Sequence, residues 1–235
     1  GIITIPPAFG GAGVAAEDID GDGTVDLLLL GGLGNRLYLG QGDGRFTDVT
    51  EQSGITFRRG SDRLPGEPRQ PLIADFDNDG RLDVAYVGVP DRLVLRYQPE
   101  PGTMDWSRTW SVRLPELAPA AWMISSGDLN GDGRTDVAVL GEEVTYVLYQ
   151  ADDGTMRTPT KLINTSAQLS LLQVADIDGD GRDDLSYQAN EGSERGLCAR
   201  MQTADGRLGP EVRFDLHQPR SVTLYDIDQQ PGKEI

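Results

Sequence analysis

An aspartate-rich loop motif recurs along the chain and constrains the fold more than any other feature. Its first copy, DIDGDGTVD, begins at Asp18, and the similar segments DFDNDGRLD, DLNGDGRTD and DIDGDGRDD begin at Asp75, Asp128 and Asp176. A degenerate fifth copy, DIDQQPGKE, begins at Asp226. The copies are 57, 53, 48 and 50 residues apart. A period of about 50 residues is typical of propeller blades and similar repeat arrays.

Each full copy stands between segments that have the character of β-strands. An apolar stretch precedes the motif and another follows it, as in GVAAED before the first copy and VDLLLLGG after it. Two more strand candidates complete most units, such as RLYLGQ and RFTDVT, and turn pairs such as Asp43-Gly44 and Asp153-Gly154 separate them. Four short strands per unit are the composition of a propeller blade. The sequence therefore predicts an all-β propeller with four full blades and part of a fifth.

The motif also has the ligand pattern of a calcium loop. Positions 1, 3 and 5 supply oxygen ligands, the glycine at position 6 allows a sharp turn, position 7 offers a backbone carbonyl and position 9 is an acid. Clustered carboxylates repel each other by about 1 kcal/mol per pair at 4 Å in water, and a bound cation offsets this cost. We predict about four Ca²⁺ ions, because flexible loops of hard oxygen ligands suit this ion. The predicted ligands are Asp18, Asp20, Asp22, Thr24 and Asp26; Asp75, Asp77, Asp79, Arg81 and Asp83; Asp128, Asn130, Asp132, Arg134 and Asp136; and Asp176, Asp178, Asp180, Arg182 and Asp184.

An EF-hand, a metal-free turn and a site for another metal all fit the motif less well. An EF-hand needs a glutamate at position 12 and a following helix, whereas here position 12 lies in strand-like segments and is Leu29, Tyr86, Val139 or Tyr187. Asp, Asn and Gly also make good turns without metal, but four copies in one ligand register argue against that possibility. Magnesium prefers octahedral sites that keep water, and zinc prefers His or Cys, of which the chain has only His217 and Cys198.

The fifth copy departs from the pattern. It keeps Asp226 and Asp228 and offers Glu234 at position 9, but Gln230 replaces the acid at position 5 and Pro231 replaces the turn glycine. We expect weak metal occupancy there, or none.

Composition limits the compartment and the partners of the chain. With 21 basic and 38 acidic residues the formal charge is -17, which argues against nucleic acid and anionic membranes as partners. The sequence has no apolar run of 18 residues, so we expect no membrane span. One cysteine excludes an intrachain disulfide, and Cys198 is interpreted as a small buried residue. The chain starts at Gly1 without a methionine, which is compatible with a removed signal peptide.

Catalytic motifs are missing from the sequence. The chain has no G-x-S-x-G, H-E-x-x-H, P-loop or G-x-G-x-x-G segment, and its one histidine leaves little room for acid-base chemistry. A two-carboxylate glycosidase site stays open as an alternative, because its two acids need not be near in sequence. We predict that the chain is not an enzyme.

The residues resemble the FG-GAP/VCBS repeat family, which includes the β-propellers of integrin α subunits. The first unit has Phe9-Gly10, Val14-Ala15, the motif and Gly31-Gly32 where the family has Gly-Ala-Pro, and the second unit keeps Gly88-Val89-Pro90. Residues 35–55 are also similar to repeats of the cartilage-acidic-protein type, common in secreted bacterial proteins. The resemblance implies a metal in the loop between the first two strands of each blade, and functions in adhesion, ligand binding or assembly.

The resemblance also implies a longer array than this chain supplies. We expect one propeller domain over residues 1–235, with units of roughly 1–57, 58–115, 116–166 and 167–218 and a partial unit over 219–235. Such propellers usually have seven blades, so we interpret the chain as a fragment of a seven-bladed ring. Open strand edges promote unwanted pairing, so we expect other blades or a partner chain to cover them.

Three further segments allow two interpretations each. Trp106 and Trp110 would share a face of one strand, and packing between blades is favoured over an aromatic platform for sugar or peptide. An arginine-rich segment is favoured as a solvated connector over a docking loop for an acidic partner. The triplet Asn164-Thr165-Ser166 fits the glycosylation pattern, which often arises by chance. The arginine-rich segment contains Arg58, Arg59, Arg63 and Arg69.

Together these observations favour a non-catalytic binding, adhesion or assembly module that Ca²⁺ stabilises and that has a protein or glycan ligand. Calcium sites of extracellular modules work at about 10⁻⁴ to 10⁻³ M, so the predicted location is extracellular or periplasmic. Two alternatives remain. The chain is an accessory propeller of a larger enzyme or redox complex, or it is a carbohydrate-binding lectin.

Overall fold

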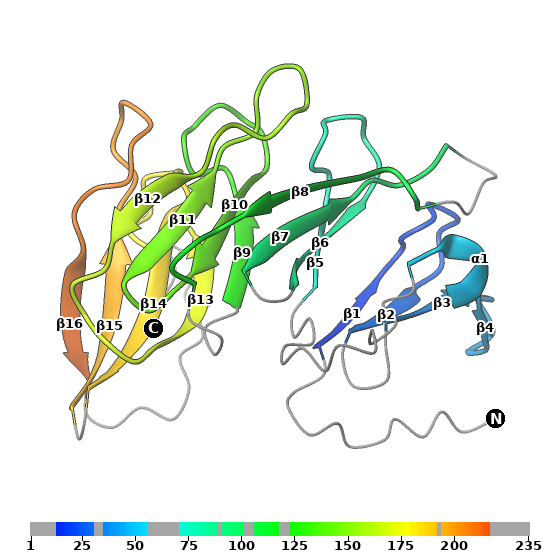
Figure 1. Ribbon diagram of the computed structural model, residues 1–235, viewed down its shortest axis with the longest axis horizontal. Coiled ribbons are helices and arrows are strands. Elements are labelled where there is room, and N and C mark those ends of the chain that lie inside the picture. Colours follow the sequence, from blue (N-terminus) through cyan, green and yellow to red (C-terminus); the bar gives the residue numbers. More distant parts are fainter. Residues whose placement is uncertain are drawn as a thin grey trace. The chain divides into compact units, whose positions relative to one another are not determined.

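Four small β-sheets make up the described part of the chain. The computed structural model describes residues 13–30, 35–55, 71–88, 91–100, 106–117, 123–191 and 194–216. In each sheet four strands are neighbours in chain order, which gives an antiparallel meander (Figure 1). This arrangement confirms the prediction of all-β units with the architecture of propeller blades.

The strands have the following bounds. The first blade contains β1 (Gly13–Glu17), β2 (Asp26–Leu30), β3 (Arg36–Gly40) and β4 (Phe46–Asp48). The second contains β5 (Leu72–Ala74), β6 (Asp83–Gly88), β7 (Arg92–Arg96) and β8 (Thr109–Arg113). The third contains β9 (Met123–Gly127), β10 (Asp136–Leu140), β11 (Val144–Leu148) and β12 (Thr160–Ile163). The fourth contains β13 (Leu169–Ala175), β14 (Asp184–Glu191), β15 (Glu194–Arg200) and β16 (Val212–Leu216).

A short helix, α1 (Thr50–Ser53), follows β4 and was not predicted. The predicted strand over RFTDVT ends early because the Asp48 carboxylate accepts the Thr50 backbone N–H at 3.0 Å, which starts a turn. The Thr50 hydroxyl oxygen in turn accepts the Leu37 N–H at 2.9 Å. A four-residue helix is too short to show a helical period in the sequence.

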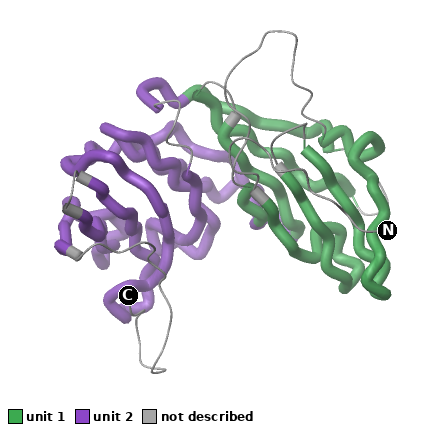
Figure 2. The backbone as a smooth tube through the Cα atoms, turned by 90° about the horizontal axis from the view of Figure 1, so that it is seen from below, with its two compact units in different colours: residues 1–73, 81–113 green, residues 74–80, 114–235 purple. Residues whose placement is uncertain are grey.

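The chain divides into two compact units, residues 1–73 with 81–113 and residues 74–80 with 114–235 (Figure 2). In the first unit, the core joins residues of the first two blades, including Ile19, Leu28 and Tyr86. Trp106 belongs to this core and is 2% exposed, which confirms packing as its role. Trp106 precedes β8, however, so the prediction that it shares one strand with Trp110 is wrong.

The core of the second unit lies between the third and fourth blades. Ala138 and Leu140 of β10 pack with Leu185 and Tyr187 of β14 and with Cys198 of β15. Every residue of β10 and β11 is buried, because a central strand of a blade is covered on both faces. Cys198 is fully buried, as predicted for a small apolar residue.

A buried ion pair of the fourth blade is hydrogen-bonded to the third blade. Glu211 and Arg200 have side chains that are 2% and 7% exposed and lie 3.6 Å apart. The Thr165 hydroxyl, which follows β12, donates to Glu211 at 2.6 Å. Burial acts to raise the pKa of Glu211, but hydrogen bonds from Thr165 and Tyr187 outweigh it and lower this pKa.

The adjacent Asn164 is engaged in the fold. It is 9% exposed, and its side-chain amide donates to the Gly141 carbonyl at 3.1 Å. The Thr145 hydroxyl donates to its side-chain oxygen at 2.9 Å. The structure therefore argues against glycosylation of Asn164 in the folded protein.

Glycines in two hairpin turns lie against the aspartate loop of the preceding blade. A Cβ at Gly206 would lie 2.3 Å from the Asn130 carbonyl oxygen, and one at Gly154 would lie 2.2 Å from that of Asp77. Both glycines have positive φ, 74° and 75°, which disfavours other residues. The turns of the third and fourth blades therefore need glycine both for their own conformation and for their approach to the neighbouring loop.

Gly206→Ala should destabilise the protein more than Gly44→Ala. Gly44 holds the same turn position in the first blade with φ 82°, but a Cβ there would meet no atom within 4 Å. Both variants incur about 1 kcal/mol for the left-handed backbone, and Gly206→Ala adds a backbone clash of about 1–3 kcal/mol. Urea unfolding measures the difference, and equal losses would contradict the close approach.

Candidate metal centres

The first aspartate of each loop organises the loop backbone. In the loop between β1 and β2, Asp18 Oδ1 accepts the N–H groups of Gly21 and Asp22 at 2.9 and 3.0 Å, and Oδ2 accepts that of Gly23 at 2.9 Å. The carboxylate thus replaces the ladder partners that these amides lack in a turn.

The same pattern recurs in the other loops. Asp128 accepts from Gly131, Asp132 and Gly133 at 2.7, 3.0 and 2.7 Å. Asp176 makes the equivalent three bonds at 2.8, 3.2 and 3.0 Å. Asp75 accepts from Asp77, Asp79 and Gly80 at 3.2, 3.2 and 2.8 Å. The four loops therefore share one local fold.

Carboxylates converge within these loops. Oxygen atoms of Asp18, Asp20 and Asp22 all lie within 4.8 Å of one another. Oxygen atoms of Asp176, Asp178 and Asp184 do the same. In the third loop, position 3 is Asn130, whose amide oxygen is also a hard ligand.

The first loop shows the electrostatic cost of this convergence. Burial raises the pKa of Asp20, and repulsion from Asp26 and Asp22 adds to the rise. A bound cation would reverse that effect. Carboxylate groups brought together on a hydrogen-bonded loop have the donor chemistry of a site for a hard cation.

The closing aspartate at position 9 is a structural clamp as well as a candidate ligand. Its four copies, which begin β2, β6, β10 and β14, are fully buried. One carboxylate oxygen accepts a hydrogen bond from the backbone N–H of position 2. Ile19 donates in this way to Asp26 at 2.8 Å, and Leu129 donates to Asp136 at 3.0 Å. The other accepts an N–H from the end of the third strand, as from Gly40 to Asp26 at 2.8 Å. The four closing residues are Asp26, Asp83, Asp136 and Asp184.

Burial is expensive for such a carboxylate. It raises the pKa of Asp136 to about 7, although bonds from the Gln150 and Leu129 N–H groups act in the opposite direction. The pKa of Asp184 is raised for the same reason. Positive charge from a cation in the loop would favour the ionised form of Asp136 and lower this pKa.

The side chain at position 7 approaches the carboxylate at position 5. Arg134 forms an ion pair with Asp132, and a second one with Asp152 at 2.8 Å. Arg182 pairs with Asp180 in the same way, and the Thr24 hydroxyl donates to Asp22. The sequence pattern assigned only the backbone carbonyl of position 7 a role. The long arginine side chain folds back within its own loop, which spacing alone does not reveal.

Sequence reasoning also missed the residues that hold the closing aspartates from the third strand. The donors are the N–H groups of Gln98, Gln150 and Gln202, at 2.8, 2.9 and 2.8 Å from Asp83, Asp136 and Asp184. A glutamine 14 to 18 residues after the closing aspartate was the available signal. Its spacing varies from blade to blade, so the repeat is weak in the sequence.

Several sequence predictions fall outside the described residues. They include the connector arginines, the degenerate fifth copy with Asp226, Asp228 and Glu234, and part of the glycine-containing segments that carry the family resemblance. Among the described helices, none is long and apolar enough to cross a membrane.

These blades and their aspartate loops define one class of propeller repeat, and comparison with known families identifies it. The chain matches the model for the FG-GAP-like repeat over residues 18–86, 75–139 and 128–186. The three matches begin at the first aspartates of successive loops. The chain therefore belongs to the FG-GAP-like repeat family.

A solved structure supports the fold. An Agrocybe aegerita lectin that recognises non-reducing terminal N-acetylglucosamine aligns with a TM-score of 0.58 at 16% identity, over 87% of this chain and 53% of the lectin chain. The Photorhabdus luminescens Tc holotoxin pore aligns with a TM-score of 0.48 at 22% identity, over 85% of this chain and 9% of that chain. This chain thus spans about half or less of each of these proteins. No curated protein matches it significantly.

Asp26→Asn should destabilise the metal-free protein more than Asp20→Asn. Both changes remove one charge from the same loop, but only Asp26 is buried with both oxygens bonded to backbone N–H groups. An amide group cannot accept with its nitrogen, so one buried N–H loses its partner, at about 1–3 kcal/mol. Urea unfolding in EDTA measures this. Equal effects of the two variants would show that charge removal alone is responsible.

Proposed function

We propose that this chain is a Ca²⁺-stabilised part of a β-propeller that acts as a non-catalytic binding or assembly module outside the cytoplasm. The observation that carries the proposal is the repeated loop in which carboxylates converge on a backbone frame. Carboxylate, amide and carbonyl oxygens in a flexible loop suit Ca²⁺ better than Mg²⁺ or Zn²⁺.

The ligands in each loop would be the residues at positions 1, 3, 5 and 9 and the carbonyl of position 7. When bound, Ca²⁺ supplies positive charge between carboxylates that otherwise repel each other. The chain itself orients these groups, since Asp18 and its counterparts hold the loop amides and the buried closing aspartates hold the loop against the sheet. For the third and fourth loops, Asp132 and Asp180 would exchange an arginine partner for the cation.

The size of the effect points to a role in stability. With about 1 mM free calcium and a dissociation constant of about 10⁻⁴ M, each site adds roughly 1.4 kcal/mol to the free energy of unfolding. Four such sites approach the net stability of a typical domain. Four ions would also reduce the formal charge from -17 to about -9. This assumed affinity is that of extracellular calcium modules, so the size of the effect applies to the proposed location outside the cytoplasm.

Two observations support the non-catalytic part of the proposal. The sequence lacks recognised catalytic motifs, and its clustered carboxylates lie in the repeated loops. An accessory role beside a catalytic or redox domain is the competing proposal.

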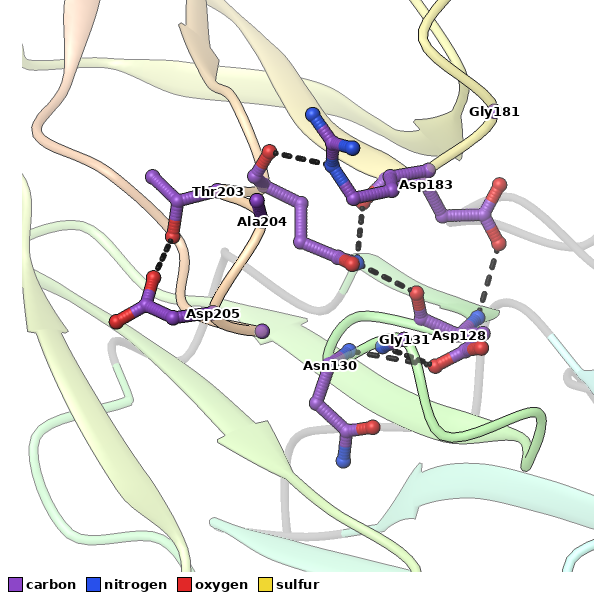
Figure 3. A pocket seen from close by; sticks show the side chains of 11 residues that line it. Asp128, Asn130, Gly131, Gly181, Asp183, Thr203, Ala204 and Asp205 are labelled. Atoms are coloured by element: carbon purple, nitrogen blue, oxygen red, sulfur yellow. Dashed lines mark hydrogen bonds between the residues drawn. The ribbon is translucent and has the colours of Figure 1, made fainter.

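A glycan is the second candidate for a ligand because a polar pocket lies beside the third loop. The pocket has a volume of about 590 Å³, and its lining includes Asn130 and Asp128 of the loop and Thr203 and Asp205 of a hairpin turn. Figure 3 shows the Asp205 carboxylate turned toward the Thr203 hydroxyl, which donates to it at 2.6 Å. Carboxylate, amide and hydroxyl groups of this kind bind sugar hydroxyls. The likeness to a lectin fold is compatible with this candidate.

Calcium should raise the melting temperature strongly. We expect a rise of about 10 °C or more between EDTA and 1 mM CaCl₂, and a smaller rise in MgCl₂. Asp178→Ala, which removes a ligand oxygen, should lower the calcium-dependent rise and remove one bound ion in equilibrium dialysis. Asp43→Ala makes the same charge change in a hairpin turn outside the loops and should do neither. An unchanged melting temperature in calcium would overturn the proposal.

A glycan array tests the second candidate. Binding through the pocket should fall at least tenfold in Asp205→Ala, because its carboxylate lines the pocket. Asp43→Ala, at the equivalent turn of the first blade, is the control and should bind like the native chain. Native binding that both variants retain would exclude this pocket, and an array without hits would favour a protein ligand.

A further inference from the structure

One glutamine side chain connects two successive aspartate loops in the second unit. The Gln202 backbone N–H donates to Asp184, the closing aspartate of the fourth loop, at 2.8 Å. Its side-chain Nε2 donates to the carbonyl of Asp128, the first aspartate of the third loop, at 2.7 Å. Gln202 is 2% exposed. Gln202 thus belongs to the fourth blade and hydrogen-bonds to predicted ligand residues of both the third and the fourth loop.

The third loop receives a second contact from the same neighbour. The backbone N–H of Asp128 donates to Asp183 Oδ2 at 2.9 Å, and Figure 3 shows Asp183 reaching toward Asp128. Gln202 Nε2 also donates to the Asp183 carbonyl at 3.0 Å. The backbone N–H and carbonyl of Asp128 are therefore both hydrogen-bonded to residues of the fourth blade. A shift of the third loop would thus strain or break contacts with the fourth blade's loop.

The first unit repeats this connection independently. The Gln98 backbone N–H donates to Asp83, the closing aspartate of the second motif, at 2.8 Å. Its Nε2 donates to the Ile19 carbonyl in the first loop at 2.7 Å. Ile19 follows Asp18 directly and also donates its own N–H to Asp26. Two blades thus use a glutamine for one purpose, which argues against a coincidental contact.

The third blade carries a glutamine at the same place without the connection. The Gln150 N–H donates to Asp136 at 2.9 Å, as in the other blades. Its Nε2 atom is buried and has no hydrogen-bond partner within the described part of the chain. Gln150 therefore separates the two roles, since it clamps a closing aspartate but makes no side-chain bond to another loop.

We propose that Gln202 and Gln98 are positioning residues that couple the cation loops of adjacent blades, so that Ca²⁺ in one loop raises the affinity of the next. This inference rests on the proposed calcium binding. A cation that fixes Asp128 also fixes the glutamine side chain and, through its backbone, Asp184. Because coupling between binding sites is reciprocal, filling the fourth loop must equally favour the third.

Site-resolved titration of the full chain tests the coupling. The Gly133 amide bonds to Asp128 and reports on the third loop, and the Gly181 amide bonds to Asp176 and reports on the fourth. We would follow both by NMR during addition of CaCl₂. Disabling the fourth loop with Asp178→Ala, which removes a ligand oxygen altogether, should weaken calcium binding at Gly133 about fivefold or more. In a Gln202→Met background, Asp178→Ala should leave the affinity at Gly133 unchanged.

Gln150→Met is the matched control. It replaces a buried glutamine at the same blade position, but it removes no side-chain bond between loops, so the effect of Asp178→Ala at Gly133 should persist. If Gln202→Met does not fold, Gln98→Met provides the same test for the first and second loops, with Gly23 as the reporter and Asp77→Ala as the disabling change.

The outcomes separate the two proposals. No calcium-dependent shift at any loop glycine would overturn calcium binding and, with it, the coupling. If calcium binds normally and Asp178→Ala leaves the affinity at Gly133 unchanged, the coupling alone is overturned. An effect of Asp178→Ala that survives Gln202→Met would overturn the role of Gln202 in the coupling.

Discussion

The structure depends on a buried carboxylate that accepts backbone hydrogen bonds at the start of the second strand of each blade. Asp26 and its three counterparts are fully buried, and an isolated charge there would be very costly. Two or more N–H donors offset part of that cost by joining the loop to the end of the third strand. The blade is thereby closed on one side by a group that also borders the aspartate loop, so a metal held in the loop would act on the stability of the blade.

Contacts between blades use the same loops. The turn glycines Gly154 and Gly206 approach the loop carbonyls of the preceding blade, and Gln98 and Gln202 donate to such carbonyls. The apolar cores hold neighbouring blades together without directional bonds. The polar contacts at the loop end add direction, because each requires a particular atom at a particular distance. A loop in this fold is therefore a joint between blades as well as a candidate binding site.

Much of this was readable from the sequence because its signals are local. Strand alternation predicted the four-stranded units, and the absence of Glu at position 12 together with strands after the motif excluded an EF-hand. The ligand assignments remain predictions. Other features depended on contacts between distant residues. Spacing placed Trp106 on a strand. It lies instead in a turn, and its backbone N–H donates to the Ser53 carbonyl at 2.9 Å. Helix α1 and the arginine pairs of position 7 are local, but the helix is too short to show a period, and spacing does not reveal a side chain that folds back within its own loop.

The sequence by itself determined the repeat, the strand content and the oxygen-rich chemistry of the loops, since these follow from residue type and spacing within about ten positions. Only the tertiary structure decided that the closing aspartates are buried clamps, that Asn164 is engaged in the fold, and that Gln202 reaches the loop of the preceding blade. The physical reason is distance along the chain. Gln202 and Asp128 are separated by 74 residues, and packing of whole blades brings them together.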